Sequence, residues 1–99
     1  MTSHDACVAN WAKAYKDKGW TVHADIMGYL APPEINKKIP DIYATKGSSA
    51  NVLEVETDET INSDHAKEQI ATFKNWADLS PNRTFRLSLA NSKGCTEVK

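Results

Sequence analysis

The sequence predicts one domain of the α/β (α+β) class, with elements in the order helix, strand, strand, strand, helix, strand. Three observations predict this class. Apolar residues recur with the helical period in two segments, they alternate with polar residues in two others, and two further β-prone runs flank a turn. A chain of 99 residues with 40% hydrophobic content is expected to form one small domain that buries about 60–70% of its unfolded surface. The core is expected at about residues 3–90, followed by a polar tail at 91–99.

The first helix is predicted to begin after Thr2, because Thr2 and Asp5 have the spacing of a capping box. It is expected to run to about Lys18, and Gly19 is well placed to end it. Its predicted buried stripe comprises Cys7, Val8, Trp11, Ala12, Ala14 and Tyr15. Residues 20–26 then alternate apolar and polar side chains and predict a strand.

Residues 27–38 contain two prolines, a glycine and an asparagine, which is too many helix and strand breakers for a regular element. We expect the longest loop of the domain here. Two interpretations are about equally favoured by the sequence. The loop is a passive crossover, or its Lys37 and Lys38 contact a substrate.

Two neighbouring strands are predicted at residues 39–43 and 52–56, with a hairpin turn near 45–49. Side chains alternate faces along a strand, so Glu54 and Glu56 are expected on one face. Pairing of the two strands would bring Asp41 close to both. Three carboxylates placed together repel one another, so such a group favours Mg²⁺ or Mn²⁺, which take oxygen ligands. The competing interpretation is that the two glutamates form the solvated face of a half-buried strand.

A second helix is expected after Asn62 or Ser63, running to about Ala77 or Leu79. Residues 84–90 then alternate strictly and predict the last strand. Its inward side chains are expected to be Phe85, Leu87 and Leu89, and its outward side chains Arg86 and Ser88.

The segment Pro40-Asp41, followed by Glu54-Val55-Glu56, resembles the signature of the PD-(D/E)XK nuclease superfamily. The resemblance spans about residues 3–90 and includes the order of the elements. It implies a restriction endonuclease-like α-β-β-β-α-β core, with a central mixed sheet flanked by helices. The chain departs from the signature where Glu56 replaces the family's lysine, in the manner of the Glu-x-Glu variants known in some restriction enzymes. The departure leaves open whether catalysis is retained.

The resemblance implies a metal-dependent DNA endonuclease or a domain similar to Holliday junction resolvases. Asp41 and Glu54 would bind Mg²⁺ or Mn²⁺ with the Val55 carbonyl, and Glu56 would add a ligand or hold the attacking water. Lys67 and Gln69 resemble auxiliary active-site groups on the second helix. A lysine on a helix is most often a solvated side chain, and this is the competing interpretation of Lys67.

The net charge of −1 is unevenly distributed. Residues 50–64 contain five acids and no Lys or Arg, so this segment carries −5 and the rest of the chain carries +4. A metal ion would offset the acidic segment and leave a mildly basic surface, which favours weak binding of DNA by structure rather than by sequence. The small size suggests a homodimer, which would place two sites on two DNA strands.

Two alternatives remain open from the sequence. One is a catalytically inactive nuclease-fold module that binds nucleic acid or a protein partner, and the other is a structural dimerisation domain. We expect a cytoplasmic protein without a membrane segment, because the sequence has no signal-peptide pattern and no apolar run near the roughly 20 residues that span a bilayer. Cys7 and Cys95 are accordingly expected to be reduced.

Overall fold

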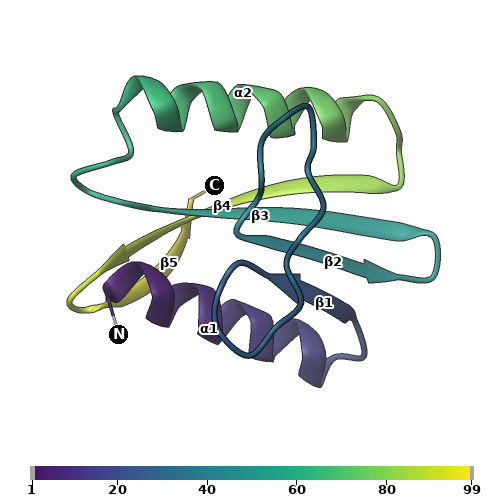
Figure 1. Ribbon diagram of the computed structural model, residues 1–99, viewed down its shortest axis with the longest axis horizontal. Helices are drawn as coiled ribbons and strands as arrows, with labels where there is room; N and C mark the ends of the chain where they lie inside the picture. The colour runs from purple at the N-terminus through teal and green to yellow at the C-terminus, as the bar shows by residue number, and fades with distance from the viewer. Residues whose placement is uncertain (1, 99) are drawn as a thin grey trace.

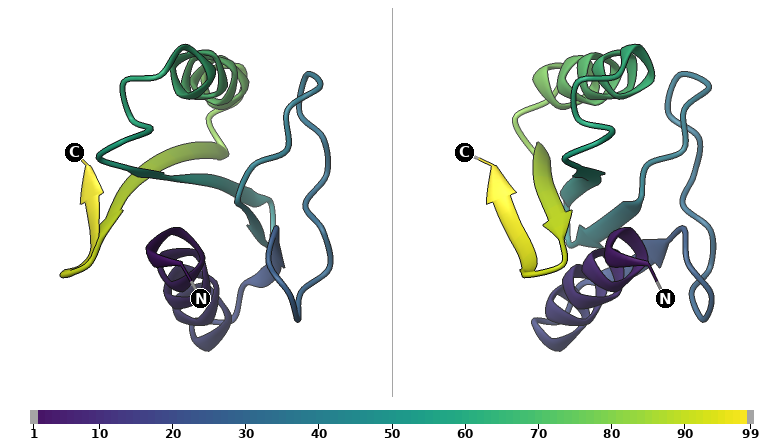
Figure 2. Two further views of the ribbon diagram at one scale, coloured as in Figure 1. Left: turned by 60° about the vertical axis from the view of Figure 1, so that its left-hand side comes forward. Right: turned by 90° about the vertical axis from the view of Figure 1, so that its left-hand side faces the viewer.

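The structure, a computed structural model, describes residues 2–98. A five-stranded sheet lies between two helices, α1 (Ser3–Asp17) and α2 (Asp64–Asp78), so the molecule has three layers (Figure 1 and Figure 2). The α/β class and the predicted element order are confirmed, with one additional strand at the C-terminal end.

The sheet consists of β1 (Thr21–Ala24), β2 (Ile42–Lys46), β3 (Ser49–Thr57), β4 (Arg83–Asn91) and β5 (Gly94–Val98), in that spatial order. Strands β3 and β4 are parallel and every other neighbouring pair is antiparallel, so the sheet is mixed. A parallel pair needs a long crossover, and α2 supplies it. This arrangement places α2 over one face of β3 and leaves the other face for α1.

Both helices begin where their capping residues predict. The hydroxyl of Thr2 accepts a hydrogen bond from the Asp5 backbone N–H at 3.1 Å, and the hydroxyl of Ser63 accepts one from the Ala66 N–H at 3.1 Å. Gly19 has φ +90°, a conformation that glycine adopts without steric cost, and the chain turns there into β1. The predicted stripe of α1 is largely buried, although Trp11 is only partly buried and Ala14 is exposed.

The second strand begins later than predicted. Strand β2 starts at Ile42, so residues 39–41 precede it, and Pro40 is fully buried there. Proline lacks the N–H that a ladder residue donates, which explains why regular pairing starts after it. The hairpin is also tighter than expected, because Lys46 pairs with Ser49 across a two-residue turn at residues 47–48.

Both faces of the central strands are covered. Leu53 and Val55 of β3 pack in the apolar cluster under α1, whereas Val52 packs with Phe73 and Trp76 of α2. This coverage overturns one expectation for β4. Ser88 was predicted to point outward, but it is fully buried on the α1 side.

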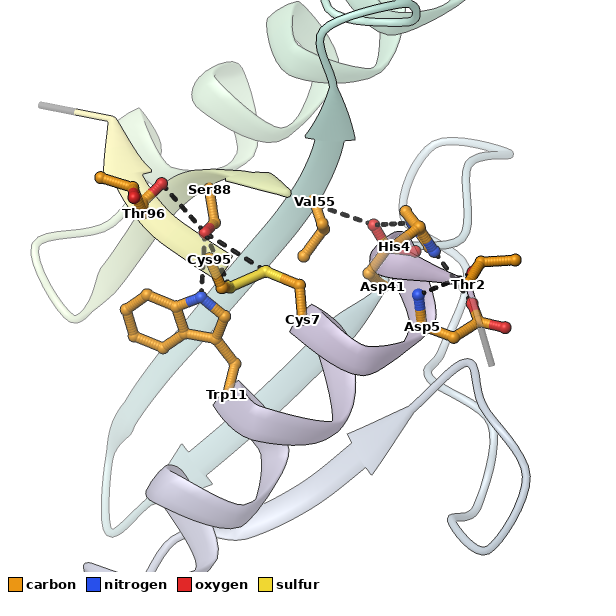
Figure 3. Close-up of a disulfide and its surroundings, with 10 residues drawn as sticks. All are labelled: Thr2, His4, Asp5, Cys7, Trp11, Asp41, Val55, Ser88, Cys95 and Thr96. Atoms are coloured by element: carbon orange, nitrogen blue, oxygen red, sulfur yellow. Dashed lines mark hydrogen bonds and ion pairs between the residues drawn. A yellow bond between two sulfur atoms is a disulfide. The ribbon is translucent and has the colours of Figure 1, made fainter. Parts of the chain in front are cut away.

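The C-terminal segment is not a polar tail. Residues 94–98 form the edge strand β5, and Cys95 forms a disulfide with Cys7 of α1 (Figure 3). The expectation that both cysteines are reduced is therefore wrong in this structure. Ser88 lies beside the disulfide, where its hydroxyl accepts a hydrogen bond from Trp11 Nε1 at 3.0 Å and donates one to the Thr96 carbonyl at 3.1 Å. The start of α1 is thus fixed to the far edge of the sheet.

The segment between β1 and β2 passes beside the sheet from the α1 layer to the α2 layer (Figure 2). It contains a tight hairpin in which Ile35 and Lys38 pair, with φ +49° at Asn36 and +70° at Lys37. Two consecutive positive φ values are typical of a type I′ turn. Ile35 anchors this hairpin by packing against the cluster under α2.

Candidate metal and nucleic-acid site

Asp41 and Glu54 lie side by side, joined by hydrogen bonds that involve the main chain. The Asp41 backbone N–H donates to Glu54 Oε1 at 2.8 Å, and the Val55 N–H donates to Asp41 Oδ2 at 2.8 Å. The two-strand arrangement predicted from the sequence therefore brings these acids together, even though Asp41 precedes the regular part of β2. These two hydrogen bonds hold the end of the β1–β2 connection against β3.

Glu54 and Glu56 share the face of β3 that α2 covers, as the strand alternation predicts. Their side chains are buried, with exposed fractions of 3% for Glu54 and 7% for Glu56. The interpretation of these residues as a solvated strand face is therefore wrong. Two carboxyl groups inside a domain of this size require either protons or cations nearby.

A cavity of about 490 Å³ brings the predicted site residues together. Its lining includes Asp41, Glu54, Val55 and Glu56, together with Lys37 and Lys38 of the loop and Gln69 of α2. Lys67 is exposed on α2, and the side chains that α2 contributes to this lining are His65 and Gln69. The structure thus groups five of the six predicted site residues and leaves Lys67 on the outer surface of the helix.

His4 was missed from the sequence and belongs to the same group. Its Nε2 lies 3.2 Å from Asp41 Oδ2, and its Nδ1 lies 3.0 Å from Asp5 Oδ1 (Figure 3). The hydrogen bond to Asp41 is the largest cause that raises the pKa of His4 from 6.5 to about 9, against an opposing effect of burial. The imidazolium form donates to both carboxylates. The capping pattern put His4 in the first turn of α1, but nothing in the sequence showed that this turn contacts Asp41.

The pKa of Glu54 is raised from 4.5 to about 9, chiefly by burial and in addition by the charges of Asp41 and Glu56. The hydrogen bond from the Asp41 N–H acts in the opposite direction, because it stabilises the carboxylate. Without an added cation, Glu54 therefore holds a proton at neutral pH. A divalent cation beside this group would reverse the balance by favouring the ionised form.

The donor types at this site suit a hard divalent cation. Carboxylate and carbonyl oxygens are the ligands that Mg²⁺ and Mn²⁺ prefer. Within residues 2–98, however, no group of three or more His, Cys, Asp or Glu side chains is arranged so that it would hold a metal ion. The hydrogen bonds of Asp41 Oδ2 to His4 and to the Val55 N–H show how this oxygen is occupied instead.

The cationic side chains of the cavity come mainly from the loop. Lys38 Nζ lies 3.5 Å from Glu68 Oε2 and is partly buried, so the loop hairpin is also tied to α2 by charge. Lys37 lies in the same turn and is exposed. Together they place two ammonium groups at a cavity whose lining contains four acids, Asp25, Asp41, Glu54 and Glu56.

No protein-family model and no curated protein matches this chain. The resemblance to PD-(D/E)XK nucleases is therefore carried by five residues in two segments, Pro40-Asp41 and Glu54-Val55-Glu56, and by the order of the elements.

Proposed function

We propose that this chain is a metal-dependent DNA endonuclease or resolvase-like domain that hydrolyses phosphodiester bonds. The observation that supports it is the convergence of Asp41, Glu54 and Glu56 on one cavity that also contains two lysines. Buried carboxylates supply oxygen ligands for a cation, and lysines at the same cavity attract a phosphate.

In this proposal, Asp41 and Glu54 hold Mg²⁺ or Mn²⁺ with the Val55 carbonyl, and Glu56 adds a ligand or positions the attacking water. When bound, the cation lowers the pKa of that water and stabilises charge on the scissile phosphate. To hold the cation, Glu54 would have to be ionised, with its proton released to solvent, and the cation would compete with His4 for Asp41 Oδ2. The proposal therefore requires these two side chains to change partners when a cation binds.

Glu56 stands where the resemblance places a lysine, so another cation has to contact the phosphate. Lys37 and Lys38 are the candidates, since both line the cavity and their turn is anchored to α2. Gln69 would orient the water or the phosphate from the α2 side. Lys67 is a weaker candidate for this role, because its side chain is exposed on α2.

The test is incubation of the purified protein with linear duplex, single-stranded and four-way-junction DNA in Mg²⁺ or Mn²⁺. Asp41→Ala and Glu54→Ala are expected to lose cleavage while keeping a cooperative thermal transition. Asp78→Ala, which removes an exposed acid at the end of α2, is the matched control and is expected to cleave normally. Cleavage that survives in Asp41→Ala and Glu54→Ala would contradict the proposal.

A second candidate is an inactive nuclease-fold module that binds nucleic acid or a protein partner. The observation that favours it is the ion pair between His4 and Asp41, which gives Asp41 a resident cationic partner without any metal. This candidate predicts salt-sensitive DNA binding without cleavage and no thermal shift with Mn²⁺.

A homodimer would supply two cuts for two strands, and light scattering at micromolar concentration with and without DNA tests it. No helix in residues 2–98 is long and apolar enough to cross a membrane. The cytoplasmic location stays a prediction, and the Cys7–Cys95 disulfide is more typical of oxidising compartments.

A further inference from the structure

A second cavity, of about 250 Å³, lies against the C-terminal half of α1, on the sheet face opposite α2. Its lining contains Trp11, Tyr15, Trp20, Lys18, Asn51 and Arg86. Cavities for drug-sized ligands occupy about 300–1,000 Å³, so this one suits a single ring system. The proposed nuclease site does not use any of these residues.

Flat groups form the walls of this cavity. The rings of Tyr15 and Trp20 meet edge to face with centroids 5.2 Å apart, and the Trp11 and Tyr15 centroids lie 6.3 Å apart. The guanidinium carbon of Arg86 lies 4.6 Å from the centroid of Trp11. Indole rings and guanidinium planes are the surfaces on which unpaired bases stack in single-strand binding proteins.

Polar groups are fixed at the same place. Tyr15 Oη accepts hydrogen bonds from Asn51 Nδ2 at 3.0 Å and from Arg86 at 3.1 Å. Arg86 is itself held by two hydrogen bonds to the Glu97 carboxylate, at 2.8 and 3.0 Å. Because Tyr15 accepts in both of its hydrogen bonds, its hydroxyl proton is available to an acceptor on a ligand. The polar edge is thus preorganised by β3, β4 and β5.

The charge at this cavity differs from that of the acidic site. Its described lining residues include no acid and two cations, Lys18 and Arg86, of which Arg86 is paired with the Glu97 carboxylate beside the cavity. Lys46 Nζ donates to the Lys18 carbonyl at 2.8 Å, so a third cation lies next to the cavity. A ligand that combines a flat heteroaromatic ring with an attached phosphate matches this combination.

We propose that this cavity binds an unpaired nucleobase of a single-stranded or branched nucleic acid, with Lys18 and Lys46 near its phosphate. The choice of nucleic acid rests on the proposed function. Tyr15 follows His4 by eleven positions on α1, which corresponds to about 16 Å along the helix axis. One straight element therefore carries a residue of the acidic site at its start and the base-binding rings near its end. The inference deepens the proposed function by selecting substrates with unpaired bases over continuous duplex.

Tryptophan fluorescence tests this proposal directly, because the three tryptophans lie on different faces of the sheet. Trp11 and Trp20 line the cavity, whereas Trp76 packs under α2 on the other face. The protein is titrated in EDTA, so that no cleavage occurs, with a ten-nucleotide oligothymidylate, an abasic oligonucleotide of equal length and a duplex. We expect quenching by the oligothymidylate only. The quenching should persist in Trp76→Phe and disappear in the Trp11→Phe/Trp20→Phe double variant.

Measuring the oligothymidylate affinity of single-substitution variants, beside a control variant, distinguishes loss of binding from loss of folding. Trp20→Ala is expected to weaken oligothymidylate binding at least about fivefold, since one stacked base contributes about that factor or more. Lys18→Ala changes an exposed side chain and should weaken binding and reduce its salt dependence. Lys74→Ala, an exposed lysine on α2, is the matched control. Equal binding of abasic and thymidylate strands, or quenching that follows Trp76, overturns the proposal.

The two proposals fail separately. Cleavage that depends on Asp41, without base-dependent quenching, would refute the base-binding proposal and support the nuclease proposal. Base-dependent quenching through Trp11 and Trp20, without cleavage in Mg²⁺ or Mn²⁺, would support base binding at this cavity and refute the nuclease proposal. Absence of both overturns both.

Discussion

The backbone N–H of Asp41 donates a hydrogen bond to Oε1 of Glu54 at 2.8 Å, across 13 positions of the chain. Because the donor belongs to the main chain, an Asp41→Ala substitution does not remove it. What that substitution removes is the acceptor of the Val55 N–H and the partner of His4. Asp41→Ala therefore alters the charge of the site while one contact that positions Glu54 remains available.

The pH dependence of stability should report on Glu54. Its pKa of about 9 in the folded protein exceeds the ordinary 4.5, so the folded state binds more protons between these values and stability falls as pH rises through them. Glu54→Gln, which has no such titration, is expected to flatten this decline. Melting temperatures in EDTA at pH 6, 7.5 and 9 measure it. Parallel curves for the two proteins would refute the assignment.

His4 adds to the same decline over a narrower window. Its pKa is raised from 6.5 to about 9, so its stabilising contribution is complete below pH 6.5 and is lost as pH rises through 9. His4→Gln is expected to lower the melting temperature at pH 6 and to have little effect above pH 9. NMR titration of the His4 ring resonances measures the pKa itself. In Asp41→Ala, that pKa should return toward 6.5.

Metal binding is expected to release protons. A cation that ionises Glu54 and separates Asp41 from His4 displaces a proton from a group whose pKa is near 9. Mn²⁺ affinity should therefore increase between pH 6 and pH 8. Calorimetry in two buffers with different ionisation enthalpies measures the number of protons released. Zero release, with tight Mn²⁺ binding at both pH values, would contradict this coupling.

Removing the disulfide should destabilise the fold substantially. Cys7 and Cys95 are 88 positions apart, and a crosslink over so long a loop typically contributes about 2–5 kcal/mol. Cys7→Ala/Cys95→Ala is expected to lower the free energy of unfolding by that amount in urea titrations. Dithiothreitol should lower the stability of the parent protein similarly and leave the double variant unchanged. An identical response of both proteins would show that the bond is not formed in solution.

Two glycine substitutions in the turn at Asn36 and Lys37 distinguish the effect of backbone conformation from the effect of charge. Asn36 and Lys37 both have positive φ, which glycine tolerates better, so Asn36→Gly and Lys37→Gly should each leave stability unchanged or raise it by up to about 1 kcal/mol. Lys37→Gly also removes an ammonium group from the acidic cavity. It alone should weaken DNA binding and reduce its salt dependence. Equal DNA affinity of the two variants would exclude a substrate contact by Lys37.

Local patterns predicted much of this fold. Thr2 marked the first helix start, the second was narrowed to Asn62 or Ser63, and the alternation of residues 53–56 assigned the faces of β3. The outward assignment of Ser88 failed because alternation assumes one solvated face, whereas α1 and α2 cover both. Strand β5 was missed because short edge strands are largely polar and resemble tails.

Strand pairing predicted the part of the site that lies in or beside the β2–β3 hairpin, whereas Gln69 of α2 was indicated by the family resemblance. Asp41 and Glu54 were found because a hairpin brings sequence neighbours together. His4 reaches Asp41 across 37 positions, and Cys7 reaches Cys95 across 88, so both contacts depend on how α1 packs on the sheet. Nothing in the local sequence of α1 specifies that packing.

The bond between Cys7 and Cys95 closes residues 7–95 into a covalent ring. A single protease cut in the long connection between β1 and β2, for example after Lys38, opens this ring without dividing the molecule. Both pieces stay covalently attached, and each still carries part of the acidic cavity. Oxidised protein should therefore withstand nicking there as a two-chain particle, and reduction should be what finally separates the pieces.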